Sequence, residues 1–159
     1  IGYQTSSFSA TAYYTLGWSK RSFPEVYPNW FWANNDNRHK VNLLFSYKVM
    51  KDLEVSANWN YHTGNRITLP TNVLADGTQL YDTPFNFTLP PYHRLDLAMT
   101  YTMKSSKGND FDLSASVYNA YNNKNAFFAY VEKDENGDFN GIAYSVLPVF
   151  PTLTITYRF

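Results

Sequence analysis

The chain alternates apolar and polar residues with a period of two over much of its length. Residues 94–103 show the pattern most clearly, because every second position is apolar: Leu95, Leu97, Met99, Tyr101 and Met103. Successive side chains of an extended strand point to opposite faces, so this period predicts a strand with one apolar and one polar face.

Five further runs show the same alternation. Together with the first they occupy residues 8–19, 41–49, 53–62, 94–103, 111–118 and 152–159. A helical period of 3.6 does not persist in any segment. The sequence therefore predicts an all-β fold, an antiparallel up-and-down sheet of about six long strands.

The connections between these runs alternate in length. Residues 20–37, 64–91 and 122–150 form long connections, with Asn136-Gly137 as the expected tip of a hairpin in the last one. Residues 49–53 and 104–110 form short ones. Transmembrane β-barrels have this asymmetry, with short turns on one side of the membrane and longer loops on the other.

The strand lengths and aromatic positions favour a membrane barrel over a soluble sandwich, although periodicity alone fits both. The runs are about ten residues long, enough to cross a hydrocarbon core when tilted. Aromatic residues lie near both ends of the strands, as in the interfacial girdles of membrane barrels. Those near the long connections are Trp18, Phe23, Trp30, Phe31, Trp32 and Tyr61, and those near the short ones are Tyr47, Tyr101, Tyr157 and Phe159.

Composition excludes several other classes of protein. Thirteen basic and thirteen acidic residues give zero net charge, so the chain lacks the basic surface that nucleic-acid binding requires. It has no cysteine, no apolar stretch of about 20 residues for a transmembrane helix, and no Gly-x-Ser-x-Gly or glycine-rich phosphate motif. We therefore expect no enzymatic activity and no cofactor.

The three histidines, His39, His62 and His93, are each expected near the long-connection end of a strand. They lack the helical spacing of a metalloprotease site, and we predict no metal site.

About six strands are too few to close a barrel, since bacterial single-chain barrels have at least about eight. Each unpaired backbone group at a lipid-exposed edge would cost several kcal/mol. The chain also starts at Ile1 and shows no signal peptide, so we expect it to be a fragment of a larger barrel.

Two alternatives stay open. Residues 122–150 would supply two more strands to a small self-contained barrel, acting as a pore or adhesion scaffold, or the chain is a soluble sandwich that binds carbohydrate.

Several motifs carry a resemblance to a known family. They are residues 37–41 (Asn-Arg-His-Lys-Val), 59–70 (Trp-Asn-Tyr-His-Thr-Gly-Asn-Arg-Ile-Thr-Leu-Pro), 91–97 (Pro-Tyr-His-Arg-Leu-Asp-Leu) and 117–125 (Val-Tyr-Asn-Ala-Tyr-Asn-Asn-Lys-Asn). The end of the chain, with Leu153, Ile155, Tyr157 and the terminal Phe159 at alternate positions, resembles the assembly signal of bacterial outer-membrane proteins. In order and spacing these motifs resemble the C-terminal barrel segment of a TonB-dependent outer-membrane receptor, of the long-loop kind common in Bacteroidetes.

The resemblance implies a 22-stranded barrel in the bacterial outer membrane, of which residues 1–159 would be the C-terminal part, without the N-terminal plug. Such receptors import scarce nutrients, such as iron chelates, cobalamin or glycans, with energy delivered through TonB. The implied partners are the remaining strands and plug, the barrel-assembly machinery, TonB by way of the plug, a surface lipoprotein and outer-membrane lipid.

Two groups of residues are candidates for function. Charged residues on the polar face, expected toward the short-turn half of their strands, would contact the plug or simply form a hydrated wall: Glu54, Arg94, Asp96, Asp112 and Arg158. Residues of the long connections would capture a ligand or pack the loops together: Tyr27, Trp30, Phe31, Trp32, Arg66, Tyr81 and Phe85.

Overall fold

The computed structural model describes residues 1–104, 110–134 and 139–158, and these residues form antiparallel β-sheets without any helix. The prediction of an all-β, antiparallel fold is therefore confirmed. Among the described residues there is no helix of the length and hydrophobicity needed to span a membrane. The expected hairpin tip at Asn136-Gly137 and the terminal Phe159 lie outside the described residues.

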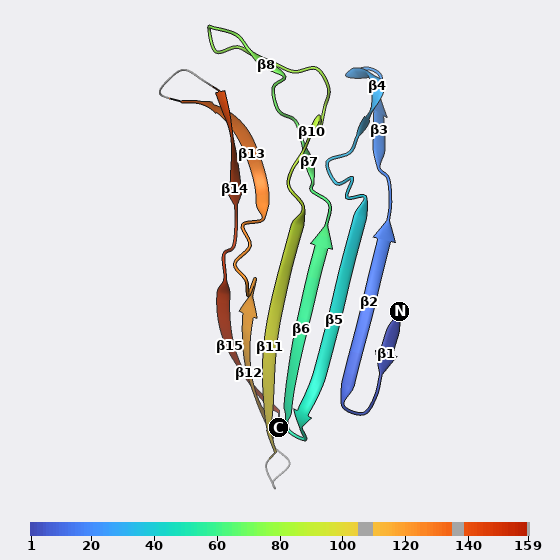
Figure 1. Ribbon diagram of the computed structural model, residues 1–159, viewed down its shortest axis with the longest axis vertical. Helices are drawn as coiled ribbons and strands as arrows, with labels where there is room; N and C mark the ends of the chain where they lie inside the picture. The colour runs from blue at the N-terminus through green and yellow to red at the C-terminus, as the bar shows by residue number, and fades with distance from the viewer. Residues whose placement is uncertain (105–109, 135–138, 159) are drawn as a thin grey trace.

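A seven-stranded sheet dominates the structure (Figure 1). Its strands, in spatial order, are β1 (Gly2–Gln4), β2 (Phe8–Leu16), β5 (His39–Met50), β6 (Leu53–His62), β11 (Tyr92–Lys104), β12 (Asp110–Tyr118) and β15 (Phe150–Arg158). The six longer strands coincide with the six runs that alternation predicts. Alternation did not reveal β1, because three residues are too few to show a period.

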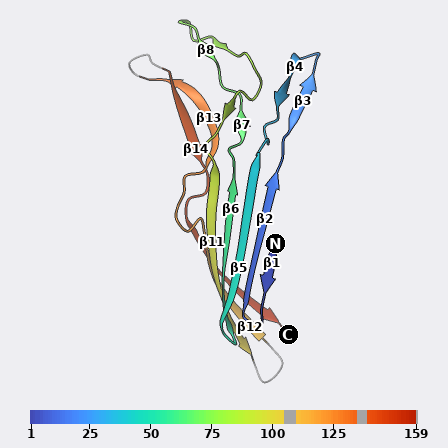
Figure 2. The same ribbon diagram turned by 45° about the vertical axis from the view of Figure 1, so that its right-hand side comes forward.

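Four small two-stranded sheets project from one end of the main sheet (Figures 1 and 2). They pair β3 (Lys20–Phe23) with β4 (Tyr27–Trp32), β7 (Arg66–Ile67) with β10 (Phe87–Thr88), β8 (Asn72–Val73) with β9 (Gln79–Leu80), and β13 (Ala126–Lys133) with β14 (Phe139–Ser145). All of them lie within the predicted long connections. We call this end the loop end of the sheet. The polypeptide that emerges from it is thus ordered into hairpins.

The strand register keeps the two faces separate across the whole sheet. Phe45 lies opposite Ala57, Ala57 opposite Leu97, and Leu97 opposite Val117. One position along, small and polar residues face one another in the same way: Ser46, Ser56, Ala98, Ser116 and Thr152. A slip of one residue between any two strands would mix these faces, so the alternation itself fixes the register.

The apolar face is the more exposed of the two, the reverse of a soluble protein. In β12, Phe111, Leu113 and Ala115 are exposed, whereas the intervening Asp112 and Ser114 are half-buried. Leu97 is 42% exposed and Ile155 is 69% exposed.

Judged by its described residues, the main sheet has no hydrophobic core on either face. Within the described part of the chain the buried hydrophobic residues are Phe31, Ala33, Leu89 and Ala129, and all four belong to the projecting segments. The sheet is also open there, because β1 pairs only with β2 and β15 pairs only with β12. Both an apolar face and two backbone edges therefore lack a partner among the described residues.

Gly64 permits the close crossing of two segments where the sheet meets the projecting hairpins. A Cβ atom placed on Gly64 would lie 1.7 Å from the carbonyl oxygen of Leu89 and 2.9 Å from that of Pro90. The crossing is held by the Leu89 N–H, which donates to the Asn65 carbonyl at 2.9 Å. Leu89 itself is buried.

We expect the substitution Gly64→Ala to lower the free energy of unfolding by about 3 kcal/mol, because two backbone segments would have to move apart. Unfolding in urea measures this. Gly17→Ala is the matched control, since no atom lies within 4 Å of its added Cβ. Equal losses in both variants would contradict a steric role for Gly64.

Candidate functional site

Arg94 organises the polar face of the main sheet near its loop end. Its guanidinium pairs with Asp96 at 2.8 Å and donates to the hydroxyl oxygens of Tyr92 at 2.9 Å and Tyr118 at 2.6 Å. It also lies 4.0 Å from the ring centroid of Tyr118. These contacts join β11 to β12 through side chains just below the projecting hairpins.

The other predicted wall residues lie at different heights on the same face. Asp112 accepts a hydrogen bond from the Thr102 hydroxyl at 2.8 Å and pairs with Arg158, which binds β12 to β15 near the short-turn end. Glu54 lies opposite Thr100 and forms no ion pair with another described residue. The five wall residues therefore form two separate pairs and one single carboxylate.

The expectation that all five lie toward the short-turn half is wrong for Arg94 and Asp96. Strand β11 begins at Tyr92, so both residues lie at its loop end. The predicted run of residues 94–103 already begins beside the long connection 64–91, so the expectation did not follow from the predicted strand.

Asp96 also supports an asparagine-rich turn after β12. Its Oδ1 accepts the backbone N–H of Asn119 at 3.0 Å, while its Oδ2 binds Arg94. Asn119 is 1% exposed and has a positive φ of 52°. Its side chain accepts the N–H of Asn123 at 3.0 Å and donates to the carbonyls of Asn123 at 3.0 Å and Leu147 at 3.3 Å. One side chain thus joins the start and the end of the β13–β14 hairpin.

Two more asparagines fix this hairpin to β11. Asn123 and Asn125 both donate to the carbonyl of His93, at 3.1 and 2.9 Å, and Asn125 accepts the His93 N–H at 2.9 Å. The β13–β14 hairpin is therefore held by side-chain hydrogen bonds at its base.

A hollow of about 380 Å³ lies between this base and the ends of β6, β11 and β12. We call it the rim pocket. The rings of His62 and Tyr92 stack in its wall, with centroids 4.8 Å apart and planes 3° apart. The rest of its lining mixes apolar groups with amides: Asn65, Pro90, Tyr118, Asn125, Ala126, Phe127, Val146 and Leu147. Pockets of this size and composition suit a small organic ligand.

Five of the seven predicted ligand-capture residues come together where two projecting segments meet. Phe31 is buried, with Tyr27 at 5.9 Å and Phe85 at 6.2 Å between ring centroids. The Arg66 guanidinium donates to the Phe85 carbonyl at 3.5 Å and lies 5.1 Å from the Trp32 ring. The aromatic rings of this group mainly pack the β3–β4 hairpin against residues 66–88.

The other two, Trp30 and Tyr81, do not join this cluster. Trp30 is 69% exposed, and the Tyr81 hydroxyl donates to Gln79 at 2.6 Å, two residues away in the same segment. Both are accessible for binding from solution.

The three histidines lie at the loop end, but each ring has its own partner. Nδ1 of His39 and His93 lies 2.8 Å from the hydroxyl of Tyr14 and Tyr121, respectively. Nδ1 of His62 lies 2.7 Å from the Thr63 carbonyl. Across the described ranges, no three His, Cys, Asp or Glu side chains gather as metal ligands would.

The β13–β14 hairpin carries an aromatic surface that the sequence analysis missed. Phe128, Tyr130 and Tyr144 lie in a row, with centroids 6.2 and 5.6 Å apart. Hydrogen bonds with Tyr144 and Glu132 help raise the pKa of Tyr130 to about 12. The alternation of Phe128, Tyr130 and Glu132 is a sequence signal for this face, although the predicted long connection 122–150 assigned these residues to no face.

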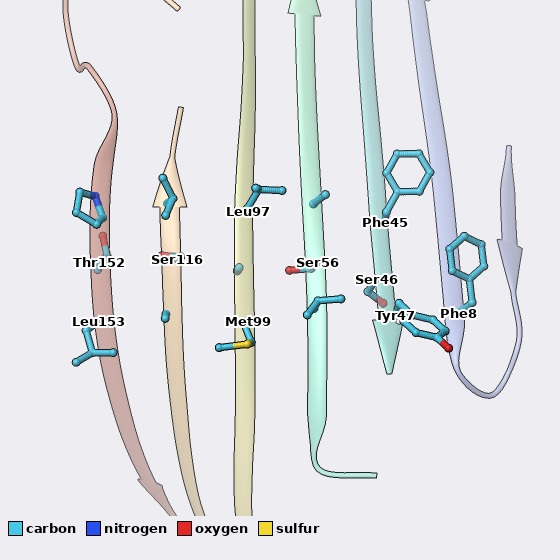
Figure 3. A pocket seen from close by; sticks show the side chains of 16 residues that line it. Phe8, Phe45, Ser46, Tyr47, Ser56, Leu97, Met99, Ser116, Thr152 and Leu153 are labelled. Atoms are coloured by element: carbon cyan, nitrogen blue, oxygen red, sulfur yellow. The ribbon is translucent and has the colours of Figure 1, made fainter. Parts of the chain in front are cut away.

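A second hollow, of about 770 Å³, is lined mainly by apolar-face residues of the main sheet (Figure 3). Small residues of the other face also contribute to its lining: Ser46, Ser56, Ala98, Ser116 and Thr152. The labelled side chains of Phe8, Phe45, Tyr47, Leu97, Met99 and Leu153 project from β2, β5, β11 and β15 around it. It has no charged residue in its lining. Its chemistry suits hydrocarbon rather than a polar ligand.

We expect Asn119→Ala to lower the free energy of unfolding by about 2–3 kcal/mol, because it leaves buried backbone groups without partners. Asn119→Gly loses the same hydrogen bonds but tolerates the positive φ, so it should be less harmful by about 1 kcal/mol. Urea unfolding of both variants tests this. A glycine variant no more stable than the alanine variant would show that backbone conformation contributes nothing here.

Comparison with known proteins returned no match, whether with protein-family models, curated proteins or solved structures. What the chain does must therefore be inferred from its own two faces, its open edges and its projecting hairpins.

Proposed function

We propose that this chain is the C-terminal part of the β-barrel of a TonB-dependent receptor in the bacterial outer membrane, which imports a scarce nutrient. One observation carries the proposal: a single-layer sheet exposes a continuous apolar face and turns a hydrogen-bonded polar face to the other side. An exposed apolar surface of this extent needs a nonpolar environment. Lipid on the apolar side and water on the polar side satisfy both faces.

Strand length supports this placement. The six longer strands contain between 9 and 13 residues, and a tilted strand of about 9–11 residues crosses a bilayer core. Aromatic rings lie on the apolar face near both ends. Phe111 and Tyr157 pair at 4.7 Å near the short-turn end, and Trp59 stacks on Tyr61 at 5.9 Å near the loop end. Such rings suit the two membrane interfaces.

The open edges support a larger barrel. The outer edge of β15 and the edge formed by β1 and β2 present backbone groups that have no ladder partner among the described residues. In lipid these groups require pairing with further strands. The proposal assigns those strands to the rest of a 22-stranded receptor, whose plug would face the polar wall around Arg94 and Asp112.

The transport role rests on the motif resemblance, and the chemistry of the loop end supports it. The rim pocket and the exposed Trp30 and Tyr81 lie on the projecting side, where an incoming nutrient would first meet the receptor. The assembly signal at Leu153, Ile155 and Tyr157 would be read by the barrel-assembly machinery.

Single-cysteine labelling tests the membrane placement, because these 159 residues contain no cysteine. We expect a fluorophore on Leu97→Cys to be quenched strongly by lipids with brominated chains in reconstituted intact protein. The same fluorophore on Ala98→Cys, the next residue on the opposite face, should be quenched little. Equal quenching at both positions, or none at either, would contradict the assignment of lipid to the apolar face.

The mass of the intact polypeptide tests whether the chain belongs to a large receptor. Denaturing mass spectrometry of the natural protein should give a mass several-fold above the 18.4 kDa of these residues. A mass near 18.4 kDa would instead favour the small self-contained barrel and would contradict the receptor proposal even if the labelling succeeds.

A further inference from the structure

Three cationic side chains surround one indole ring at the loop end of the sheet. Nζ of Lys20 lies 4.4 Å from the ring centroid of Trp32, and the guanidinium carbons of Arg38 and Arg66 each lie 5.1 Å from it. We call these four residues the basic cluster. Lys20 and Trp32 come from the β3–β4 hairpin, Arg38 from the segment before β5, and Arg66 from β7. Three separate stretches of chain therefore build the cluster.

The cluster has more positive charge than its neighbours neutralise. Among the described residues, the one carboxylate in ion-pair contact with it is Asp36, which is 6% exposed. Three cations against one carboxylate leave two positive charges. A cation held against an aromatic face keeps its full charge, because the ring contributes only a quadrupole. The surplus therefore favours an anion.

Asp36 is also poorly placed to satisfy the two arginines. Its Oδ2 lies 3.8 Å from Nη2 of Arg38 and 3.6 Å from Nε of Arg66, well beyond the 2.7–2.9 Å of a charge-assisted hydrogen bond. Its Oδ1 accepts the Ser19 N–H at 2.7 Å instead. The carboxylate therefore fixes the backbone at Ser19 and leaves the guanidinium donors largely unused.

The exposure of Arg38 supplies an independent observation. Its side chain is 39% exposed, and its ion-pair partner among the described residues is Asp36, at 3.8 Å. Its Nε atom is buried without a hydrogen-bond acceptor among the described residues, so the exposed part of the side chain is what a ligand can meet. Guanidinium groups present planar pairs of donors that match the oxygens of phosphate.

We propose that the basic cluster binds a phosphate group, with Arg38 and Arg66 as the donors and Lys20 as a further charge. The phosphate would belong to a dissolved ligand or to a lipid headgroup. A lipid source is included because Arg38 also lies 5.8 Å from the ring of the exposed Trp18. This site rests on the geometry of the cluster alone, and it stands or falls independently of the transport role.

Titration of the intact protein with inorganic phosphate tests the site, with the fluorescence of its tryptophans and calorimetry as readouts. We expect saturable binding that Arg38→Gln weakens about tenfold or more, as loss of a hydrogen bond to a charged group implies. Lys20→Gln, at an exposed position, should weaken it less and leave folding unchanged. Arg21→Gln is the matched control: it removes the same charge from the same hairpin, but Arg21 makes no cation–π contact with Trp32.

Asp36→Asn provides a change in the opposite direction. It keeps an oxygen to accept the Ser19 N–H but removes the competing charge, so phosphate affinity should rise. A merely structural cluster would gain nothing from this change. No saturable phosphate binding by the unsubstituted protein, or equal weakening by Arg21→Gln and Arg38→Gln, would overturn the proposal.

Competition then identifies the source of the phosphate. Displacement of bound inorganic phosphate by short-chain phosphatidic acid, and not by glycerol phosphate, supports a lipid headgroup. Displacement by both supports a dissolved ligand. Failure of both phosphate esters to displace inorganic phosphate would overturn a site for a phosphate group carried by a larger molecule.

Discussion

The rest of the structure depends on a sheet that is one layer thick and different on its two faces. A soluble protein buries its apolar side chains against a second layer, and that burial is the main favourable contribution to folding. Here the described apolar side chains of the main sheet, from Phe45 to Ile155, stay half-buried or exposed, and the few buried hydrophobic residues lie elsewhere. Among the described residues, the sheet is therefore held by its backbone ladders and polar-face contacts, and its apolar face has no packing partner.

The polar face contributes connections between strands rather than a core. Arg94 joins β11 to β12, Asp112 joins β12 to β11 and β15, and Asn42 joins β5 to β6 through Asn58 at 3.1 Å. Each contact crosses one strand boundary, so together they tie neighbouring strands without filling the space beyond them. A wall built in this way stays open to water or to a second domain, and it remains ordered where no hydrophobic packing supports it.

The long strands and their faces could be predicted from the sequence, because alternation is visible within the residues of each strand alone. It revealed less of the site, which depends on long-range contacts. Asp96 was predicted as a wall charge, but both its oxygens are used within the chain, one of them by a residue 23 positions away. Trp32 and Arg66 were both predicted as ligand-capture residues, but Lys20 and Arg38, which meet them in the fold, were not. An alternation of period two cannot predict these side-chain contacts, because the residues lie on different connections.

The projecting segments fold by rules different from those of the sheet. Phe31, Ala33 and Leu89 are buried among them, and Asn37 connects them by donating to Asn65 at 2.7 Å and to the Thr63 carbonyl at 2.8 Å. They therefore have a small core and a polar network of their own, as a water-soluble protein does. This division separates the packing of the hairpins from that of the sheet, whose residues are constrained by their faces. Gly64 and Asn119 lie where the two parts meet, Gly64 at a close backbone crossing and Asn119 with a buried side chain that joins the two ends of the β13–β14 hairpin.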